Sequence, residues 1–263
     1  MQKRGVGCSF LLFLYHRVKQ LIIDQMKNLS LKTAIAAILL VALGSVAGWS
    51  QDKGKYDYLG EAGLDASIYR GPEAPKFPFL FEGTQYAYTD EFEEGTVLYN
   101  GVEYRGVHLN LSASSDELHL KVLKSGIVIE LEKRLVGGFA IGEREYLSLQ
   151  GDNAVDGLAP GFYEVLHSGR SLLLKKNVKK IAVRKHEEKG IFRQFESANK
   201  YYVVKDGTSG QVLRVGDIVK MFDENKKELK GFVKKNRDRY FGSENREKFF
   251  KAVIGAADGK MEE

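Results

Sequence analysis

Residues 86–184 are dominated by short runs in which apolar and polar side chains alternate, as in strands with one buried face. The run Thr96–Tyr99 is followed by Asn100-Gly101, a dipeptide that favours the tight turn of a β-hairpin, and then by Val102–Tyr104. Further runs occupy 107–111, 118–122, 127–131, 138–141, 145–149, 162–166, 171–174 and 178–183. Strands at this close spacing predict an antiparallel β domain, folded as a sandwich or small barrel, rather than βαβ units.

The pattern changes after residue 185. Residues 200–205 and 211–215 predict one more hairpin, with Asp206-Gly207 in its turn. Three segments then repeat apolar residues with the spacing of amphipathic helices. These residues are Val215, Ile218, Val219 and Phe222 in the first, Leu229, Phe232 and Val233 in the second, and Phe249, Phe250, Val253, Ile254 and Ala257 in the third. The predicted class is α+β: an antiparallel β sandwich or small barrel, a β-hairpin, and a C-terminal segment of about three short helices.

Residues 26–50 have the organisation of a secretory signal peptide. Two lysines follow Met26, an uncharged apolar run extends over 33–46, and small residues precede a cleavage point between Ser50 and Gln51. The apolar run is shorter than the roughly 20 residues that a membrane-spanning helix needs. We therefore expect a mature chain that begins near Gln51, is soluble after cleavage, and resides in the periplasm or cell envelope.

The remaining boundaries follow from composition. We interpret residues 1–25, which precede the signal peptide, as a leader that results from a mis-assigned start codon. Residues 51–85 contain many Gly residues and three of the four Pro residues, so they predict an irregular arm. The β domain then spans 86–184, and the hairpin and helical tail span 185–263.

Removal of residues 1–50 changes the chemistry of the chain. The single Cys, Cys8, and the single Trp, Trp49, both lie there, so the mature chain has no disulfide, thiolate nucleophile or cysteine metal site. It retains 34 of the 40 Lys and Arg residues and 34 of the 35 Asp and Glu residues, and is therefore neutral. Its halves differ: residues 51–160 carry a net charge of −9 and residues 161–263 carry +9. This neutrality, together with export, argues against nucleic acid as a partner.

The basic stretch around the last predicted strands of the β domain is the one candidate binding surface. Such a cluster can bind an anion, for example a lipid headgroup or an acidic glycan. The alternative is a solvated sheet face whose long side chains protect an edge strand from pairing. The residues of this surface are Arg170, Lys175, Lys176, Lys179, Lys180 and Arg184.

No catalytic, metal or cofactor site is predicted. The four histidines of the mature chain, at positions 108, 119, 167 and 186, lack the spacing of a zinc site. Ser197-Ala-Asn-Lys200 has the S-x-x-K spacing of acylating enzymes, but it runs directly into a predicted strand rather than beginning a helix.

Four segments resemble a known group of proteins. They are Tyr99-Asn-Gly-Val-Glu-Tyr104, Asp116-Glu-Leu-His-Leu120, Gly161-Phe-Tyr-Glu-Val-Leu166 and Asp223-Glu-Asn-Lys-Lys-Glu-Leu-Lys230. Together they resemble uncharacterised exported, periplasmic proteins of Bacteroidota-type bacteria, over about residues 85–257. The resemblance implies an envelope location, and it implies no activity and no catalytic residue.

We therefore expect a non-enzymatic periplasmic or cell-envelope binding or accessory module, whose partner is an envelope protein or a glycan. Thirteen tyrosines favour this expectation, because Tyr is a frequent contact residue. Two alternatives stay open. One is an envelope hydrolase that acts on glycan or peptide through carboxylates distant in sequence, and the other is a self-associating structural protein.

Overall fold

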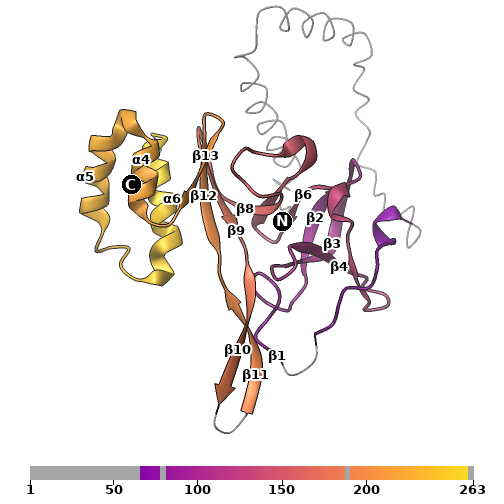
Figure 1. Cartoon of the computed structure of the whole chain (residues 1–263). Helices are drawn as coiled ribbons and strands as arrows, with labels where there is room; N and C mark the ends of the chain where they lie inside the picture. The colour runs from indigo at the N-terminus through magenta and orange to yellow at the C-terminus, as the bar shows by residue number, and fades with distance from the viewer. Residues whose placement is uncertain (1–65, 78–80, 187–189, 260–263) are drawn as a thin grey trace, which may run out of the picture. The chain divides into compact units, whose positions relative to one another are not determined.

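The computed structural model describes residues 66–77, 81–186 and 190–259. The predicted leader and signal peptide, residues 1–50, lie outside the described residues, as does most of the predicted arm. The chain divides into two units, Met1–Ser67 and Ile68–Glu263. All described strands and α-helices belong to the second unit (Figure 1).

Ten strands form one antiparallel sheet in the order β13-β12-β9-β8-β7-β6-β2-β3-β4-β5. Their bounds are β2 Glu93–Tyr99, β3 Val102–Ser112, β4 Glu117–Lys121, β5 Val128–Glu130, β6 Val136–Ile141, β7 Arg144–Leu149, β8 Gly161–Ser168, β9 Leu172–Lys176, β12 Lys200–Lys205 and β13 Thr208–Val212. A second sheet has the order β1-β11-β10, with β1 Phe81–Glu82, β10 Lys179–His186 and β11 Gly190–Ser197.

Two hairpin turns form where the sequence predicts them. Asn100 and Gly101 have φ angles of 49° and 77°, and Asp206 and Gly207 have φ angles of 47° and 74°. Positive φ at both central residues is the geometry of the type I′ turn, which matches the twist of paired strands. Asn, Asp and Gly tolerate this region better than other residues, which explains why these dipeptides connect β2 to β3 and β12 to β13.

The α+β class is confirmed, whereas the barrel alternative is wrong. The sheet order is linear, and its end strands β13 and β5 pair with different neighbours instead of with each other. The sandwich alternative concerns how sheet faces pack and stays a prediction. Strand β11 was not predicted, and β3 is one continuous strand of 11 residues where the sequence suggested two short ones.

Three helices follow the sheet: α4 Val215–Met221, α5 Lys226–Asn236 and α6 Arg246–Ala257. They confirm the three predicted amphipathic segments. Buried side chains of all three pack with Leu173, Val203 and Val212 of the sheet in one hydrophobic cluster.

Short 3₁₀ turns occupy Ser67–Tyr69, Lys133–Leu135, Gly151–Asn153, Asp223–Asn225 and Ser243–Asn245. None of the helices within the described residues is both long enough and apolar enough to cross a membrane.

Aromatic side chains make up much of the core of the large sheet. Phe139 is fully buried, its ring stacks on Tyr146 with a centroid distance of 4.6 Å, and it meets the edge of Phe162 at 5.1 Å. Loss of this ring would leave a cavity. The neighbouring strands cannot move to fill it, because hydrogen bonds between strands hold their backbones in place.

We predict that Phe139→Ala lowers the free energy of unfolding by about 3–5 kcal/mol. The matched control is Phe241→Ala, since Phe241 is 82% exposed, and its effect should stay within about 0.5 kcal/mol. Urea unfolding followed by circular dichroism measures both. Equal effects of the two substitutions would contradict the core described here.

Candidate functional site

The structure divides the six residues of the predicted anion surface among different environments. Lys175 and Lys176 are directed into the protein, with Lys175 only 4% exposed. The Lys175 amine donates to a Glu247 carboxylate oxygen at 2.9 Å, and the Lys176 amine donates to Asp116 at 2.6 Å. Both charges are thus neutralised internally and are not presented to an external anion.

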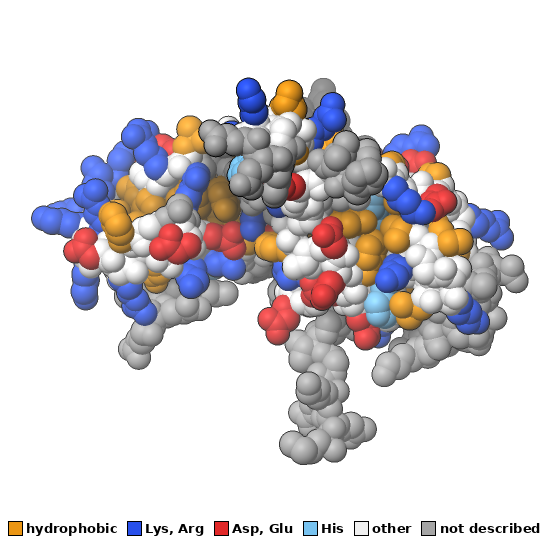
Figure 2. Space-filling view, turned by 90° about the horizontal axis from the view of Figure 1, so that it is seen from below, with side chains coloured by type: hydrophobic (Ala, Val, Ile, Leu, Met, Phe, Trp, Pro, Cys, Tyr) orange, Lys and Arg blue, Asp and Glu red, His pale blue; other side chains and the backbone are white. Residues whose placement is uncertain are grey.

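Arg170 also has an internal partner, since its guanidinium donates to the Ala257 carbonyl at the end of α6. The other three residues lie on β10. Arg184 pairs with Glu196 across the β10–β11 ladder, while Lys179 and Lys180 lie on opposite faces of the strand. On the face drawn in Figure 2, Lys and Arg side chains surround the helical segment.

A buried ionic network surrounds Lys175. Glu164, on β8, is 5% exposed and accepts hydrogen bonds from the Tyr88 hydroxyl at 2.8 Å and from the Asn177 amide at 2.7 Å. The Lys175 amine lies 3.8 Å from Glu164 and also donates to the Tyr88 hydroxyl at 2.9 Å. The network joins the consecutive strands β8 and β9 to α6, which is distant from them in sequence.

The pKa shifts of this network follow from burial and charge. Burial raises the pKa of the Tyr88 hydroxyl, and the adjacent Glu164 carboxylate raises it further. Burial acts to lower the pKa of Lys175, but Glu164 and Glu247 outweigh that effect and raise it overall. Lys175 therefore stays charged between two carboxylates. Because its amine lies between them, this carboxylate pair is a structural clamp and not an acid–base pair that faces a substrate.

We predict that Lys175→Met lowers the free energy of unfolding by about 3–5 kcal/mol, because it leaves buried carboxylates without their cation. Lys180→Met is the matched control, since Lys180 is exposed, and it should change stability by less than about 0.5 kcal/mol. The double substitution Lys175→Met with Glu164→Gln should recover part of the loss. Equal free energies of unfolding for Lys175→Met and Lys180→Met, measured by urea unfolding, would disprove the clamp.

A second cluster joins Ser171, His167 and Asp258. The Ser171 hydroxyl donates to Asp258 at 2.9 Å, and the His167 Nε2 atom lies 3.1 Å from the other carboxylate oxygen. In a catalytic Ser-His-Asp triad the histidine lies between the other two residues, whereas here the aspartate contacts both. This cluster fastens the C-terminal end of α6 to the β8–β9 turn.

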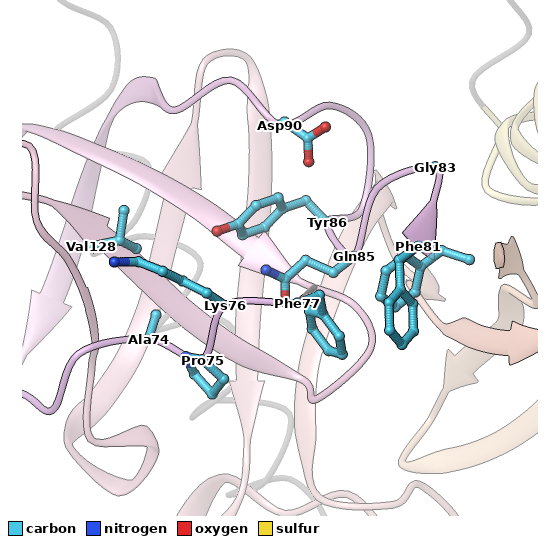
Figure 3. Close-up of a pocket in the computed structure, with 11 residues that line it drawn as sticks. Ala74, Pro75, Lys76, Phe77, Phe81, Gly83, Gln85, Tyr86, Asp90 and Val128 are labelled. Carbon is cyan, nitrogen blue, oxygen red and sulfur yellow. The ribbon is translucent and has the colours of Figure 1, made fainter. Parts of the chain in front are cut away.

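A pocket of about 330 Å³ lies where the arm meets β11 (Figure 3). Three phenylalanine rings, Phe77, Phe81 and Phe195, contact one another at centroid distances of 5.0–5.3 Å and form its apolar part. The remaining lining residues are Ala74, Pro75, Lys76, Gly83, Gln85, Tyr86, Asp90 and Val128. In Figure 3 the rings of Phe77 and Phe81 lie toward one end of the pocket and the Lys76 amine toward the other. The pocket therefore suits an apolar or aromatic group with a polar end.

Tyr86 connects the pocket to a buried histidine. Its hydroxyl lies 3.3 Å from the Nδ1 atom of His119, whose side chain is 1% exposed. Burial lowers the pKa of His119 to about 4, so this imidazole is neutral at physiological pH. Burial also raises the pKa of Tyr86 to about 12, with a smaller contribution from the negative charge of Asp90. This wall of the pocket is therefore uncharged.

One face of the β10–β11 hairpin continues from the pocket. Paired residues of an antiparallel ladder share a face, and the observed pairs are Ile181 with Phe195, Val183 with Arg193, and Lys185 with Ile191. We call this surface the Val183 face; its members are Lys179, Ile181, Val183, Lys185, Ile191, Arg193 and Phe195. Phe195 lines the pocket and pairs with Ile181 of β10, so the pocket and the Val183 face share this side chain.

The Val183 face is both apolar and basic. Val183 is 67% exposed and Ile191 is 74% exposed, and Ile181 is also exposed. Three cations and no carboxylate lie among its members. The opposite face of the same hairpin carries Glu196, which pairs with Arg184. Exposed apolar side chains gathered on one face are a feature of interaction surfaces.

Sequence reasoning found part of this site. It identified the basic character of β10 but not β11, and so it missed Phe195, which pairs with Ile181 and lines the pocket. The short segment Ile191-Phe-Arg-Gln-Phe195 does not alternate apolar and polar residues, so its β-branched and aromatic side chains were the available signal for the strand. The ionic networks had no local signal, because Lys175 meets residues 11 to 87 positions away.

The described residues contain no group of three or more His, Cys, Asp or Glu side chains arranged to hold a metal ion. Comparison of the chain with protein-family models, with curated proteins and with solved structures found no match. Function must therefore be inferred from the site itself.

We predict that acid destabilises the protein partly through His119. The unfolded chain binds a proton at this imidazole below about pH 6.5, but the folded chain does so only below about pH 4, so folding loses stability as the pH falls between these values. Between pH 7 and pH 4 the wild type should lose about 3 kcal/mol more stability than His119→Gln. Parallel losses in the two proteins, measured by urea unfolding at each pH, would show that His119 is not held neutral.

Proposed function

We propose that the mature chain is a non-enzymatic binding or accessory module of the periplasm or cell envelope. It binds its partner through the pocket and the Val183 face. The observation that carries this proposal is the continuity of the two: a pocket with three phenylalanine rings opens onto an exposed strand face that is apolar and basic.

The distribution of charge supports binding over catalysis. Lys175, Lys176 and Arg170 all have internal partners, and Glu164 accepts several hydrogen bonds within the protein. A glycoside hydrolase instead needs two carboxylates that flank the space for a scissile bond. Asp90 is the single carboxylate among the residues that line the pocket. The envelope hydrolase is therefore the less favoured alternative.

The proposed location rests on the signal peptide that the sequence predicts at residues 26–50 and on the resemblance to exported proteins. Export places the pocket and hairpin in the envelope, where proteins and glycans are the partners at hand. A bound partner would cover the exposed apolar residues of β10 and β11. Such burial stabilises a two-stranded hairpin, which is only marginally stable when its apolar face is exposed to water.

The test is site-specific photo-crosslinking in the source cell. A benzoyl-phenylalanine residue is placed at Val183 or, as the matched control, at Leu213; each position is 67% exposed. We expect a discrete adduct from position 183 and none of that size from position 213. The proposal fails if the two positions give the same adducts, or if position 183 gives none.

A further inference from the structure

We propose that the partner presents an extended, acidic and apolar polypeptide segment that pairs as an additional strand with the open edge of β10. This inference rests on the proposed function and names the class of the partner. It depends on three features of the hairpin: an unpaired backbone edge, the order of side chains along the strand, and the pocket at its inner end.

The first feature is the backbone edge. β10 ends its sheet, and no described strand pairs with the edge opposite β11. The Lys179 N–H group points away from β11, since it donates to the Ala113 carbonyl. Alternate residues of a strand direct their backbone groups to the same edge, so Ile181, Val183 and Lys185 present N–H and C=O groups on the open side. A strand that binds there satisfies these groups by β-augmentation.

The second feature is the order of side chains. Along the Val183 face, β10 presents Lys179, Ile181, Val183 and Lys185, which places two apolar residues between two cations. Directly opposed residues of neighbouring strands interact, and opposite charges stabilise the pair. The complementary strand therefore has apolar residues at its centre and carboxylates at both ends. Arg193, beside Val183 on β11, adds a third cation to this face.

The third feature is the pocket, which gives the segment an anchor. The inner end of β10 lies beside the pocket, because Ile181 pairs with Phe195 and Phe195 lines the pocket. Because the Lys179 N–H group already donates to Ala113, a partner strand pairs with the edge as far as Ile181, and its following residues turn toward the pocket and its phenylalanine rings. Binding energy in such complexes concentrates on an aromatic or aliphatic side chain that fills a pocket.

The charges of β10 also exclude other occupants. A second copy of β10 would place Lys and Arg residues opposite Lys and Arg residues, which is unfavourable, so the edge rejects self-pairing and selects an acidic strand. An anionic lipid surface lacks the backbone groups that the open edge requires, so it cannot pair with β10 as a strand does.

The probe is the peptide Glu-Glu-Val-Thr-Val-Glu-Glu-Ser-Phe-amide with fluorescein on its N-terminal amine, so that its Phe shares a face with its valines, and its affinity for the full chain is measured by fluorescence anisotropy. Its valines face Ile181 and Val183, its glutamates face the cations, and its Phe reaches the pocket. We expect saturable binding that weakens with salt, as screening of charge pairs requires. A peptide with Lys in place of each Glu should not bind.

Backbone pairing is tested with two N-methylated forms of the probe. One carries the methyl groups on both valines, and the other carries them on Thr and on the Glu that follows the second valine. A strand bonded to β10 uses only one of these alternating sets, so one form should lose at least about tenfold in affinity and the other less than about twofold. Equal effects of the two forms would overturn strand addition, and so would the absence of any effect.

Two substitutions at Val183 test the backbone edge of the protein itself. Val183→Pro removes an N–H group that faces the open edge and leaves the bonds to β11 intact, a position at which edge strands tolerate proline. Val183→Ala shortens the same side chain but keeps the N–H group. We expect the Pro variant to bind the probe at least about fivefold more weakly than the Ala variant. Equal affinities in two folded variants would contradict the proposal.

The outcomes also separate this inference from the proposed function. Failure of the peptide to bind, together with a discrete adduct from position 183 in the cell, would overturn the strand partner and leave the binding module in place. Binding to phosphatidylglycerol vesicles but not to the peptide would likewise overturn it. Absence of both the peptide complex and the cellular adduct would remove both proposals.

Discussion

The buried charge of Lys175 is the constraint around which the rest of the molecule is arranged. Lys175 is 4% exposed, and its buried ammonium group costs free energy unless carboxylates and hydrogen-bond acceptors surround it, which Glu164, Glu247 and Tyr88 supply. These partners come from β8, α6 and the segment that leads into β2. Their convergence ties α6 to β8 and β9, and it acts together with the hydrophobic cluster that packs the helical segment on the large sheet.

The same constraint determines where function can reside. Lys176 with Asp116 and the Ser171–His167–Asp258 cluster repeat the pattern, since their charged and polar groups find partners inside the protein. The β10–β11 hairpin is different. Its outer part exposes Val183 and Ile191 to solvent, and its backbone edge is open within the described structure. Within the described residues, this hairpin combines exposed apolar side chains with an open backbone edge, and this combination favours it as the place where a partner binds.

Local signals in the sequence were sufficient for much of the fold. Asn100-Gly101 and Asp206-Gly207 determined two hairpins because their turn geometry depends on the dipeptide itself. The helices were predicted equally well, because each buries one stripe of regularly spaced apolar residues. Strand β11 was missed, and the barrel alternative was wrong, because sheet order and closure depend on pairing between distant strands that no local pattern encodes.

The candidate site was predicted less well for the same physical reason. The basic residues near the end of the β domain are adjacent in sequence, yet Lys175 and Lys176 turn inward while Lys179 and Lys180 remain on β10. Which lysine is neutralised depends on carboxylates that are distant in sequence, such as Glu247. The sequence therefore predicted a single basic surface, whereas the fold divides these lysines between the interior and the surface. The pocket is likewise assembled from the arm, β5 and β11, and only the fold brings Phe77, Val128 and Phe195 together.

Amide hydrogen exchange along β10, with and without an extract of the native envelope, tests the central claim most directly. In the isolated protein, we expect the amides of Ile181, Val183 and Lys185 to exchange faster than those of Ala182 and Arg184, which are bonded to β11. Addition of the extract should slow the three open-edge amides and leave the amide of the exposed Leu213 unchanged. Uniform protection along β10 in the isolated protein, or no change on addition of the extract, would contradict the account.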